Sequence, residues 1–278
     1  MDYNRKIDFA IKLLRAIPQD GPIEISYSTG KDSDVILELA KMAEIPFEII
    51  YKNTTIDRPG SMAHAREVGA TIIQPKRTMF QLIEAMGWPS RWMRFCCKEL
   101  KEYKVHDRAV LGIRKAESNA RAKRYKEPEI CRVYSKNEKV RLYLPILEWT
   151  NEDVERFIKE RGIKCHRHYY DEQGNFHVEK RVGCCGCPLQ RDKGLADFKN
   201  NPAMFRAWVQ AYARWLETHP DTKSAATFPD VYHAVCMKMF CNNMVEYNNI
   251  FGGGQLFDIQ VDAKEFLENY FGVDLTLK

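Results

Sequence analysis

The stretch IEISYSTGKDSDVILELAKMA, residues 23–43, decides the fold of this chain. Its first five residues, IEISY, are rich in β-forming side chains and predict a buried strand. After a polar turn, apolar residues recur at helical spacing over residues 35–42, and Pro46 ends the predicted helix. FEIIY, residues 47–51, then predicts a second strand. A strand, a helix and a strand within about 30 residues predict a βαβ unit with parallel strands.

Further short apolar runs follow the same alternation with helical segments. ATIIQ (70–74), AVLGI (109–113) and RLYLPI (141–146) are predicted strands, and Thr150 with Asp153 predicts a helix cap after the last of them. This pattern favours an α/β fold with a doubly wound, mostly parallel sheet. FKNNPAMFRAWVQAYARWLETHP (198–220) is apolar at helical spacing instead. We therefore expect a domain over residues 1–190 and a helical C-terminal extension over residues 191–278.

The composition is that of a folded protein, and its net positive charge suits an anionic ligand. The 278 residues are 45% hydrophobic and carry a net charge of +5, which does not single out nucleic acid over a nucleotide. No run reaches the roughly 18 apolar residues of a membrane helix, and the N-terminus has the pattern of an amphipathic helix. We expect a cytoplasmic protein with no membrane contact. Nine cysteines in that compartment favour metal binding or catalysis over disulfides.

A six-residue polar turn joins the first strand to the first predicted helix. Gly30 permits a tight turn, and the backbone N–H groups at a helix start bind anions. Lys31 adds a cation, but Asp32 follows it and an earlier glycine is missing, so this is not a Walker A loop. The alternative is a capped strand–helix turn with a solvated lysine. The loop comprises Ser28, Thr29, Gly30, Lys31, Asp32 and Ser33.

Four cysteines have the spacing of metal ligands. Cys96 and Cys97 are adjacent, and Cys184 and Cys187 form a Cys-x-x-Cys pair. Four thiolates suit a [4Fe–4S] cluster, whose separate iron corners accept neighbouring cysteines more readily than one small ion does. Cys185 is a rival ligand, and the pair at 96–97 could instead be buried as small apolar residues. A zinc site from Cys184, Cys187, Cys165 and His168 is a further alternative. Cys131, Cys236 and Cys241 are predicted to be core residues.

Two other segments carry ligand-binding residue types. GIRKAESNARAKRY (112–125) is densely basic, and arginine binds phosphate or sulfate in a bidentate manner. Its alternative is a solvated helix face with a Glu117–Arg121 pair. Asn53 and Asp57 lie just past the second strand, where α/β sheets bind ligands, although either is also a common turn former.

Several of these motifs resemble one family in the same order along the chain. The loop at 28–33 resembles the Ser-Gly-Gly-Lys-Asp-Ser loop of the PP-loop superfamily, with Thr29 in place of the first glycine and the tight turn resting on Gly30. The cysteine pattern and Gly-x-Arg-x-x-Glu-Ser resemble cluster-bearing members of the phosphoadenosine-phosphosulfate (PAPS) reductase family. The resemblance implies a Rossmann-like fold, the cluster ligands above, and nucleotide contacts from the loop and from Asn53, Asp57, Arg114, Glu117 and Ser118. Lys31, Asp32 and Arg114 are the implied catalytic residues.

The resemblance leaves the reaction open. Reductases of the family carry a catalytic cysteine in a Glu-Cys-Gly segment, which this sequence lacks. We therefore expect an enzyme of sulfur metabolism that splits ATP to AMP and pyrophosphate and activates an acceptor for sulfur transfer, with Mg²⁺ placed by Asp32 or Asp57. One alternative is a reductase that uses APS or PAPS and another thiol. Another is a non-catalytic nucleotide or nucleic-acid binding module using the basic run 114–126. Nucleic acid as acceptor and a homo-oligomer remain open, and the sulfur donor is unknown.

Overall fold

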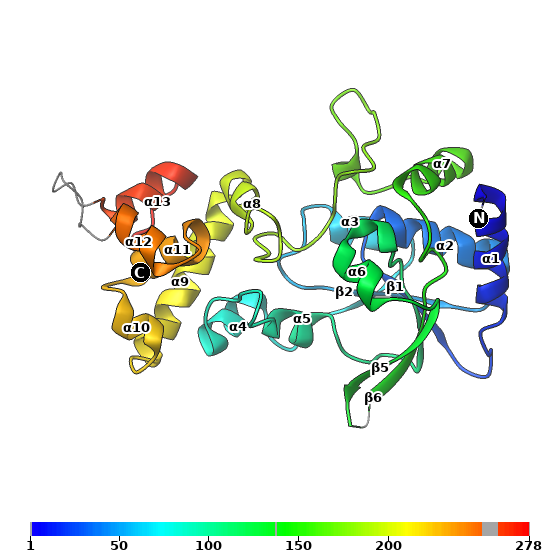
Figure 1. Cartoon of the computed structure of the whole chain (residues 1–278), viewed down its shortest axis with the longest axis horizontal. Coiled ribbons are helices and arrows are strands. Elements are labelled where there is room, and N and C mark those ends of the chain that lie inside the picture. Colours follow the sequence, from blue (N-terminus) through cyan, green and yellow to red (C-terminus); the bar gives the residue numbers. More distant parts are fainter. Residues whose placement is uncertain (1, 137, 252–260, 278) are drawn as a thin grey trace. The chain divides into compact units, whose positions relative to one another are not determined.

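The structure is a computed structural model that describes residues 2–136, 138–251 and 261–277 (Figure 1). The chain forms two compact units. The first contains Met1–Pro75 and Glu99–Gly183, and the second contains Lys76–Lys98 and Cys184–Lys278. The segment 76–98 thus belongs with the C-terminal helices, although it lies within the expected domain 1–190. The expected division into a domain over residues 1–190 and an extension over residues 191–278 stays a prediction.

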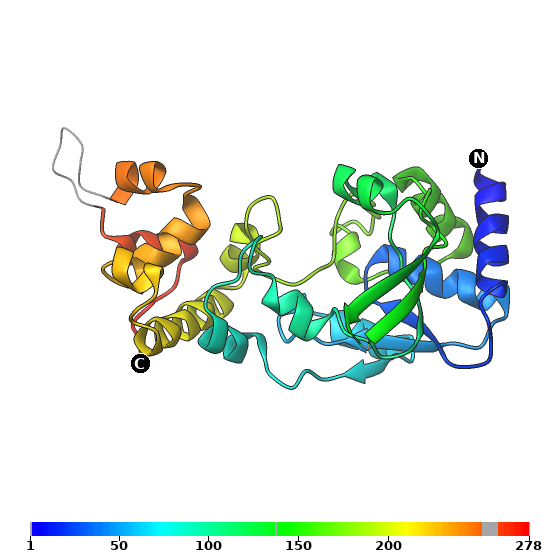
Figure 2. The ribbon, with the colours of Figure 1, turned by 60° about the horizontal axis from the view of Figure 1, so that its bottom comes forward.

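The first unit is built on a six-stranded sheet with the order β3-β2-β1-β4-β6-β5. Strands β1, β2, β3, β4 and β6 run parallel to one another, and β5 pairs antiparallel with β6, as the two green arrows of Figure 2 show. The predicted mostly parallel α/β sheet is confirmed. The strands are β1 (Ile23–Tyr27), β2 (Glu48–Lys52), β3 (Thr71–Ile73), β4 (Arg108–Val110), β5 (Glu129–Ser135) and β6 (Glu138–Tyr143).

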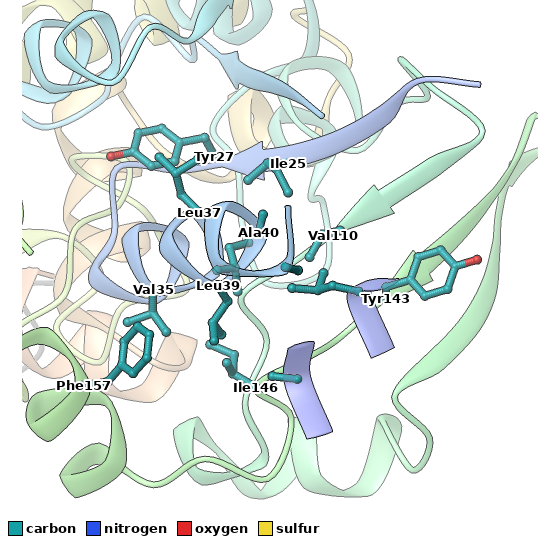
Figure 3. Packing of buried hydrophobic residues seen from close by; sticks show 14 of the residues in the cluster. Ile25, Tyr27, Val35, Leu37, Leu39, Ala40, Val110, Tyr143, Ile146 and Phe157 are labelled. Atoms are coloured by element: carbon teal, nitrogen blue, oxygen red, sulfur yellow. The ribbon is translucent and has the colours of Figure 1, made fainter. Parts of the chain in front are cut away.

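Helix α2 (Lys31–Ala43) is the most deeply buried helix of the first unit and fixes the loop before it. Leu37 and Ala40 lie toward the strands, while Val35 lies beside Phe157 of α7 (Figure 3). Each such buried aliphatic side chain stabilises the fold by roughly 1.5–3 kcal/mol. The Thr150–Asp153 capping box that begins α7 is confirmed. The other helices are α1 (Tyr3–Arg15), α3 (Ser61–Glu67), α6 (Asn119–Arg124), α7 (Asn151–Arg161), and the 3-10 turns η1 (Lys115–Glu117) and η2 (Arg167–Tyr169).

The second unit is helical, with the apolar face of α9 as its core. Trp208 of α9 is fully buried, and its ring lies 5.0 Å from that of Trp88, which explains why the segment 76–98 joins this unit. No helix in the described ranges has the length and apolarity needed to span a bilayer. The helices are α4 (Met79–Met86), α5 (Phe95–Leu100, which runs across the boundary between the units), α8 (Leu195–Asn200), α9 (Pro202–Thr218), α10 (Lys223–Thr227), α11 (Val231–Phe240), α12 (Met244–Phe251) and α13 (Ala263–Phe271).

Candidate functional site

The loops after β1 and β4 meet at the point where the strand order of the sheet reverses. From β1 the chain continues to β2 and β3 on one side, and β4 pairs with β1 on the other. Open α/β sheets bind ligands in the crevice at the carboxyl ends of the strands at such a switch point. The loop at 28–33 follows β1 and the segment 111–118 follows β4, so both predicted ligand-binding segments lie at this place.

The backbone of the loop at 28–33 turns at Thr29. Thr29 has φ 60°, in the left-handed region, and is fully buried, whereas Gly30 has φ −84° and is the N-cap of α2. The prediction that the tight turn rests on Gly30 is therefore wrong. A β-branched residue in this conformation carries strain of roughly 1–3 kcal/mol. The Thr29 hydroxyl donates to the Ser28 carbonyl at 2.6 Å and the Ser33 hydroxyl donates to the Gly30 carbonyl at 2.7 Å, which hold the turn closed.

Lys31, Asp32 and Arg114 form a connected charge cluster. Lys31 Nζ lies 3.3 Å from Asp32 Oδ2, and Arg114 Nε donates to Asp32 Oδ1 at 2.7 Å. Lys31 is only 4% exposed, so the alternative of a solvated lysine is wrong. Burial lowers the pKa of Lys31, and the adjacent Asp32 carboxylate partly offsets this.

Arg114 is held from three sides and is 1% exposed. Besides Asp32, its guanidinium donates to the Trp149 carbonyl at 3.4 Å and to Asn151 Oδ1 at 3.1 Å. A guanidinium so fully engaged orients Asp32 in the loop. Arg114 therefore has the contacts of a positioning residue, and the catalytic role that the resemblance implies stays a prediction.

Gly112 explains how the two loops approach so closely. A Cβ atom at this position would lie 2.8 Å from both the backbone carbon and the backbone oxygen of Asp32. Only glycine leaves room for the β4 loop to pack on the start of α2. Gly112 lies in the basic motif of the sequence, but the motif alone assigned it no role.

Glu117 and Ser118 shape the segment that follows. Glu117 accepts from the backbone N–H of Arg114 at 3.3 Å and pairs with Arg121, as the helix-face alternative predicted. Ser118 caps α6 by accepting from Arg121 N at 3.2 Å. Arg181 Nη2 lies 3.8 Å from Glu117, and its charge also acts to lower the pKa of Lys31. No motif in the sequence indicated Arg181.

Asn53 and Asp57 form the turn after β2. Asn53 Oδ1 accepts from Thr55 N at 2.9 Å, and Asp57 Oδ2 accepts from Thr54 N at 2.9 Å and from the Tyr51 hydroxyl at 2.7 Å. These contacts are those of turn formers, the alternative that the sequence left open. The nucleotide-contact role of these two residues stays a prediction.

Tyr169 is a contact of the loop that the sequence did not indicate. Its hydroxyl accepts from the backbone N–H of Lys31 at 3.0 Å and from Val182 N at 3.4 Å. Lys31 N is one of the first N–H groups of α2, which have no partner within the helix. Tyr169 therefore occupies one backbone donor of the loop at 28–33.

A cavity of about 860 Å³ lies beside the loop but shares no lining residue with it. His64, Cys165 and His166 are among its lining residues, and His64 Nε2 lies 3.2 Å from the buried Asp34 carboxylate. Burial acts to lower the pKa of His64, but Asp34 and Glu67 outweigh it and leave the pKa raised. Burial lowers the pKa of His166 to about 4. His166 Nδ1 accepts from His168 N at 3.1 Å, so the neutral ring carries its proton on Nε2.

All four predicted cluster cysteines belong to the second unit. The hydrogen bond to Cys97 raises the pKa of Cys96, with burial and the nearby Cys97, Cys184 and Cys187 thiols adding to the effect. The other three thiols therefore lie within electrostatic reach of Cys96. Within the described residues, no three His, Cys, Asp or Glu side chains are arranged to hold a single metal ion. Four half-buried thiols are the donor set of an iron–sulfur cubane, whose corners spread its ligands further apart.

The remaining cysteines divide into buried and exposed thiols. Cys236 and Cys241 are buried, as predicted, but Cys131 is exposed on strand β5, so its predicted core position is wrong. Cys165 lies in the core of the first unit beside Asp34, while Cys184 belongs to the second unit. All nine cysteines lie within the described ranges, and none of them forms a disulfide there.

Charged loops at the switch point of a parallel sheet define a class of α/β proteins whose ligands are anions. Within this class, the chain belongs to the phosphoadenosine phosphosulfate reductase family, whose domain model matches residues 22–190. The predicted family and fold are thereby confirmed.

Two curated relatives are themselves uncharacterised. A 37.8 kDa protein of Escherichia phage 186 is 34% identical over 143 residues, which are 47% of this chain and 38% of the relative. A protein of Methanocaldococcus jannaschii is 28% identical over 208 residues, which are 69% of this chain and 48% of the relative. The chain thus spans less than half the length of either relative.

Two solved structures show a distant likeness. An FMN adenylyltransferase of Candida glabrata, in complex with FMN and an ATP analogue, is 16% identical over 60% of each chain, with a TM-score of 0.41. A PAPS reductase of Candida auris, in a phosphate complex, is 17% identical over 59% of this chain and 88% of that chain, with a TM-score of 0.40.

Proposed function

We propose that this chain binds an adenine nucleotide at the switch point and splits ATP to AMP and pyrophosphate to activate an acceptor for sulfur transfer. The observation that carries the proposal is the charge balance around the loop. Four cations gather near Asp32 and Glu117, and Asp34 adds a third carboxylate in the first turn of α2, which leaves an excess of one positive charge. That excess matches the polyphosphate of a nucleotide. The cations are Lys31, Arg114, Arg121 and Arg181.

The proposed reaction at this site takes place in two steps. An acceptor oxygen attacks the α-phosphorus of ATP, which forms an adenylylated acceptor and releases pyrophosphate. A sulfur nucleophile then displaces AMP from the activated acceptor. Lys31 and Arg181 offset charge on the phosphates, Arg114 orients Asp32, and Asp32 or Asp57 would help to hold Mg²⁺.

Four half-buried thiols of the second unit support a [4Fe–4S] cluster, with the ligands Cys96, Cys97, Cys184 and Cys187. When bound, such a cluster supplies a redox-active or charge-tuning group next to these thiolates. Iron and acid-labile sulfide in anaerobically purified protein should fall in Cys187→Ser and stay at the wild-type level in Cys131→Ser, which changes an exposed thiol of the first unit. Zinc at stoichiometric amounts in place of iron would contradict the cluster.

Nucleotide titrations test the main proposal. ATP with Mg²⁺, APS and PAPS are each added to the anaerobic protein while the midpoint of thermal unfolding is followed, since a ligand that binds the native state raises it. We expect ATP with Mg²⁺ to give the largest rise. Lys31→Ala should abolish the rise, whereas Lys41→Ala, on the exposed end of the same helix, should keep it. No response to ATP, or no AMP and pyrophosphate with any acceptor, would count against the proposal.

A reductase acting on APS or PAPS is the second candidate, and the cysteine quartet favours it. It also needs a nucleophilic thiolate. Cys236 and Cys241 are poor candidates for that thiolate, because burial raises the pKa of each. A larger thermal shift with a sulfated adenylate than with ATP would support this candidate, and sulfite release would establish it.

A further inference from the structure

Trp92 is the most solvent-exposed large apolar side chain in the described part of the chain. It is 95% exposed, whereas Trp88, four residues earlier, is 5% exposed and packs in the core of the second unit. A tryptophan has the largest apolar surface of any side chain and is enriched where proteins bind partners.

The turn at residues 90–93 fixes this exposure. Ser90 N donates to the Met93 carbonyl at 3.2 Å, and Ser90 Oγ accepts from the backbone N–H groups of Trp92 at 3.3 Å and Met93 at 3.1 Å. These three contacts close a turn that directs the indole to solvent. The turn thus presents a preformed aromatic platform.

Two arginines lie beside that platform in the sequence. Arg91 and Arg94 flank Trp92 and are both exposed. The segment 76–98 contains five Lys or Arg residues and one acidic residue, Glu84, whose carboxylate already pairs with Arg214 at 2.5 Å. Arg94 Nη2 also donates to Cys97 Sγ at 3.6 Å, which ties the turn to the cysteine pair.

We propose that the turn Arg91–Arg94 binds single-stranded nucleic acid, with Trp92 stacked on a base and the flanking arginines on phosphates. An aromatic ring in a cationic surface is the combination with which proteins bind single strands. A duplex hides the faces of its bases, so it offers the indole nothing to stack on. A protein-docking surface buries a wide, well-packed apolar core, whereas the exposed apolar residues of this turn are Trp92 and Met93. This site is distinct from the basic run 114–126, and it deepens the proposed function, on which its biological role rests, by naming the macromolecular partner.

The test measures binding of the full chain to fluorescein-labelled oligonucleotides by anisotropy. The probes are single-stranded DNA and RNA of about 16 nucleotides and one sequence, together with the matching DNA duplex. Trp92→Ala should weaken single-strand binding by about 5- to 150-fold, because one stacked base contributes on that scale. Trp92→Phe should retain most of the affinity. Val245→Ala, which changes another exposed apolar residue of the second unit, should leave it unchanged.

Salt dependence provides an independent readout. Arg91→Gln should weaken binding and reduce the slope of log K against log salt by about 1, as expected when one phosphate contact is lost. Unchanged affinity in Trp92→Ala, or duplex binding as tight as single-strand binding, would overturn the proposal. The DNA and RNA probes show which strand is preferred.

Two controls separate this proposal from the proposed function. Trp92→Ala should keep the thermal response to ATP with Mg²⁺, because the loop at 28–33 belongs to the first unit. Oligonucleotide binding without any ATP response in the wild type would leave the site standing and refute the nucleotide-splitting function. If Trp92→Ala is misfolded by circular dichroism, the Arg91→Gln salt slope decides.

Discussion

Replacing Gly112 by alanine should displace the loop at 28–33, because the new methyl group would meet the backbone of Asp32. The added Cβ would lie 2.8 Å from the Asp32 carbonyl carbon and oxygen, closer than a Cβ is found to such atoms. The contact is with backbone at the start of a buried helix, so no side-chain rotation relieves it. Overpacking of this kind costs about 1–3 kcal/mol of unfolding free energy. At about 2–4 °C per kcal/mol for a domain of 150–250 residues, the midpoint should fall by several degrees.

The same displacement should weaken nucleotide binding. Gly112 lies two residues before Arg114, which donates to Asp32 at 2.7 Å, so a shift of the β4 loop lengthens that contact. Urea denaturation and the ATP titration are measured on the variant and on Gly21→Ala. A Cβ at Gly21 would meet only Arg108 Nη1 at 3.4 Å, so this control should match the wild type. A Gly112→Ala protein with wild-type stability and ATP response would refute the close approach of the two loops.

Three further changes have defined outcomes. Gly30→Ala should change the unfolding free energy measured in urea by less than about 1 kcal/mol. The reason is that Gly30 has φ −84° and the new Cβ would meet Ser28 Oγ at an ordinary 3.4 Å. A larger loss of stability would show that the tight turn does depend on Gly30. Arg114→Lys should lose roughly 1–3 kcal/mol in the same assay, since lysine cannot reproduce the contacts of the guanidinium, and stability equal to the wild type would contradict its anchoring role. The pKa of about 4 for His166 means that its contribution to stability is complete above pH 6.5 and is lost as the pH falls toward 4, by at most about 3 kcal/mol. Between pH 7 and pH 5, the unfolding free energy measured in urea should therefore fall less in His166→Asn than in the wild type. Equal decreases in the two proteins would contradict the lowered pKa of His166.

The sequence predicted the parallel core of the sheet because its strands are short apolar runs separated by helical periodicity. Strand β1 was predicted with the bounds that the structure has, and β2 and β3 within one residue at either end. Strand β5 was missed. Its residues alternate between half-buried and exposed at the sheet edge, and its charged residues, such as Glu129 and Arg132, masked the weak apolar signal.

The sequence identified the charged residues of the site better than it identified their roles, because those roles depend on partners distant in the chain. Lys31 and Asp32 were recognised locally, but Arg114, 82 residues beyond Asp32, is an anchor only because the fold buries it against that carboxylate. Tyr169, 138 residues beyond Lys31, accepts from the N–H that an anion would also contact. A polyphosphate at this loop must therefore share the start of α2 with a hydroxyl already in place. The cations around the loop would then supply charge that this occupied N–H cannot.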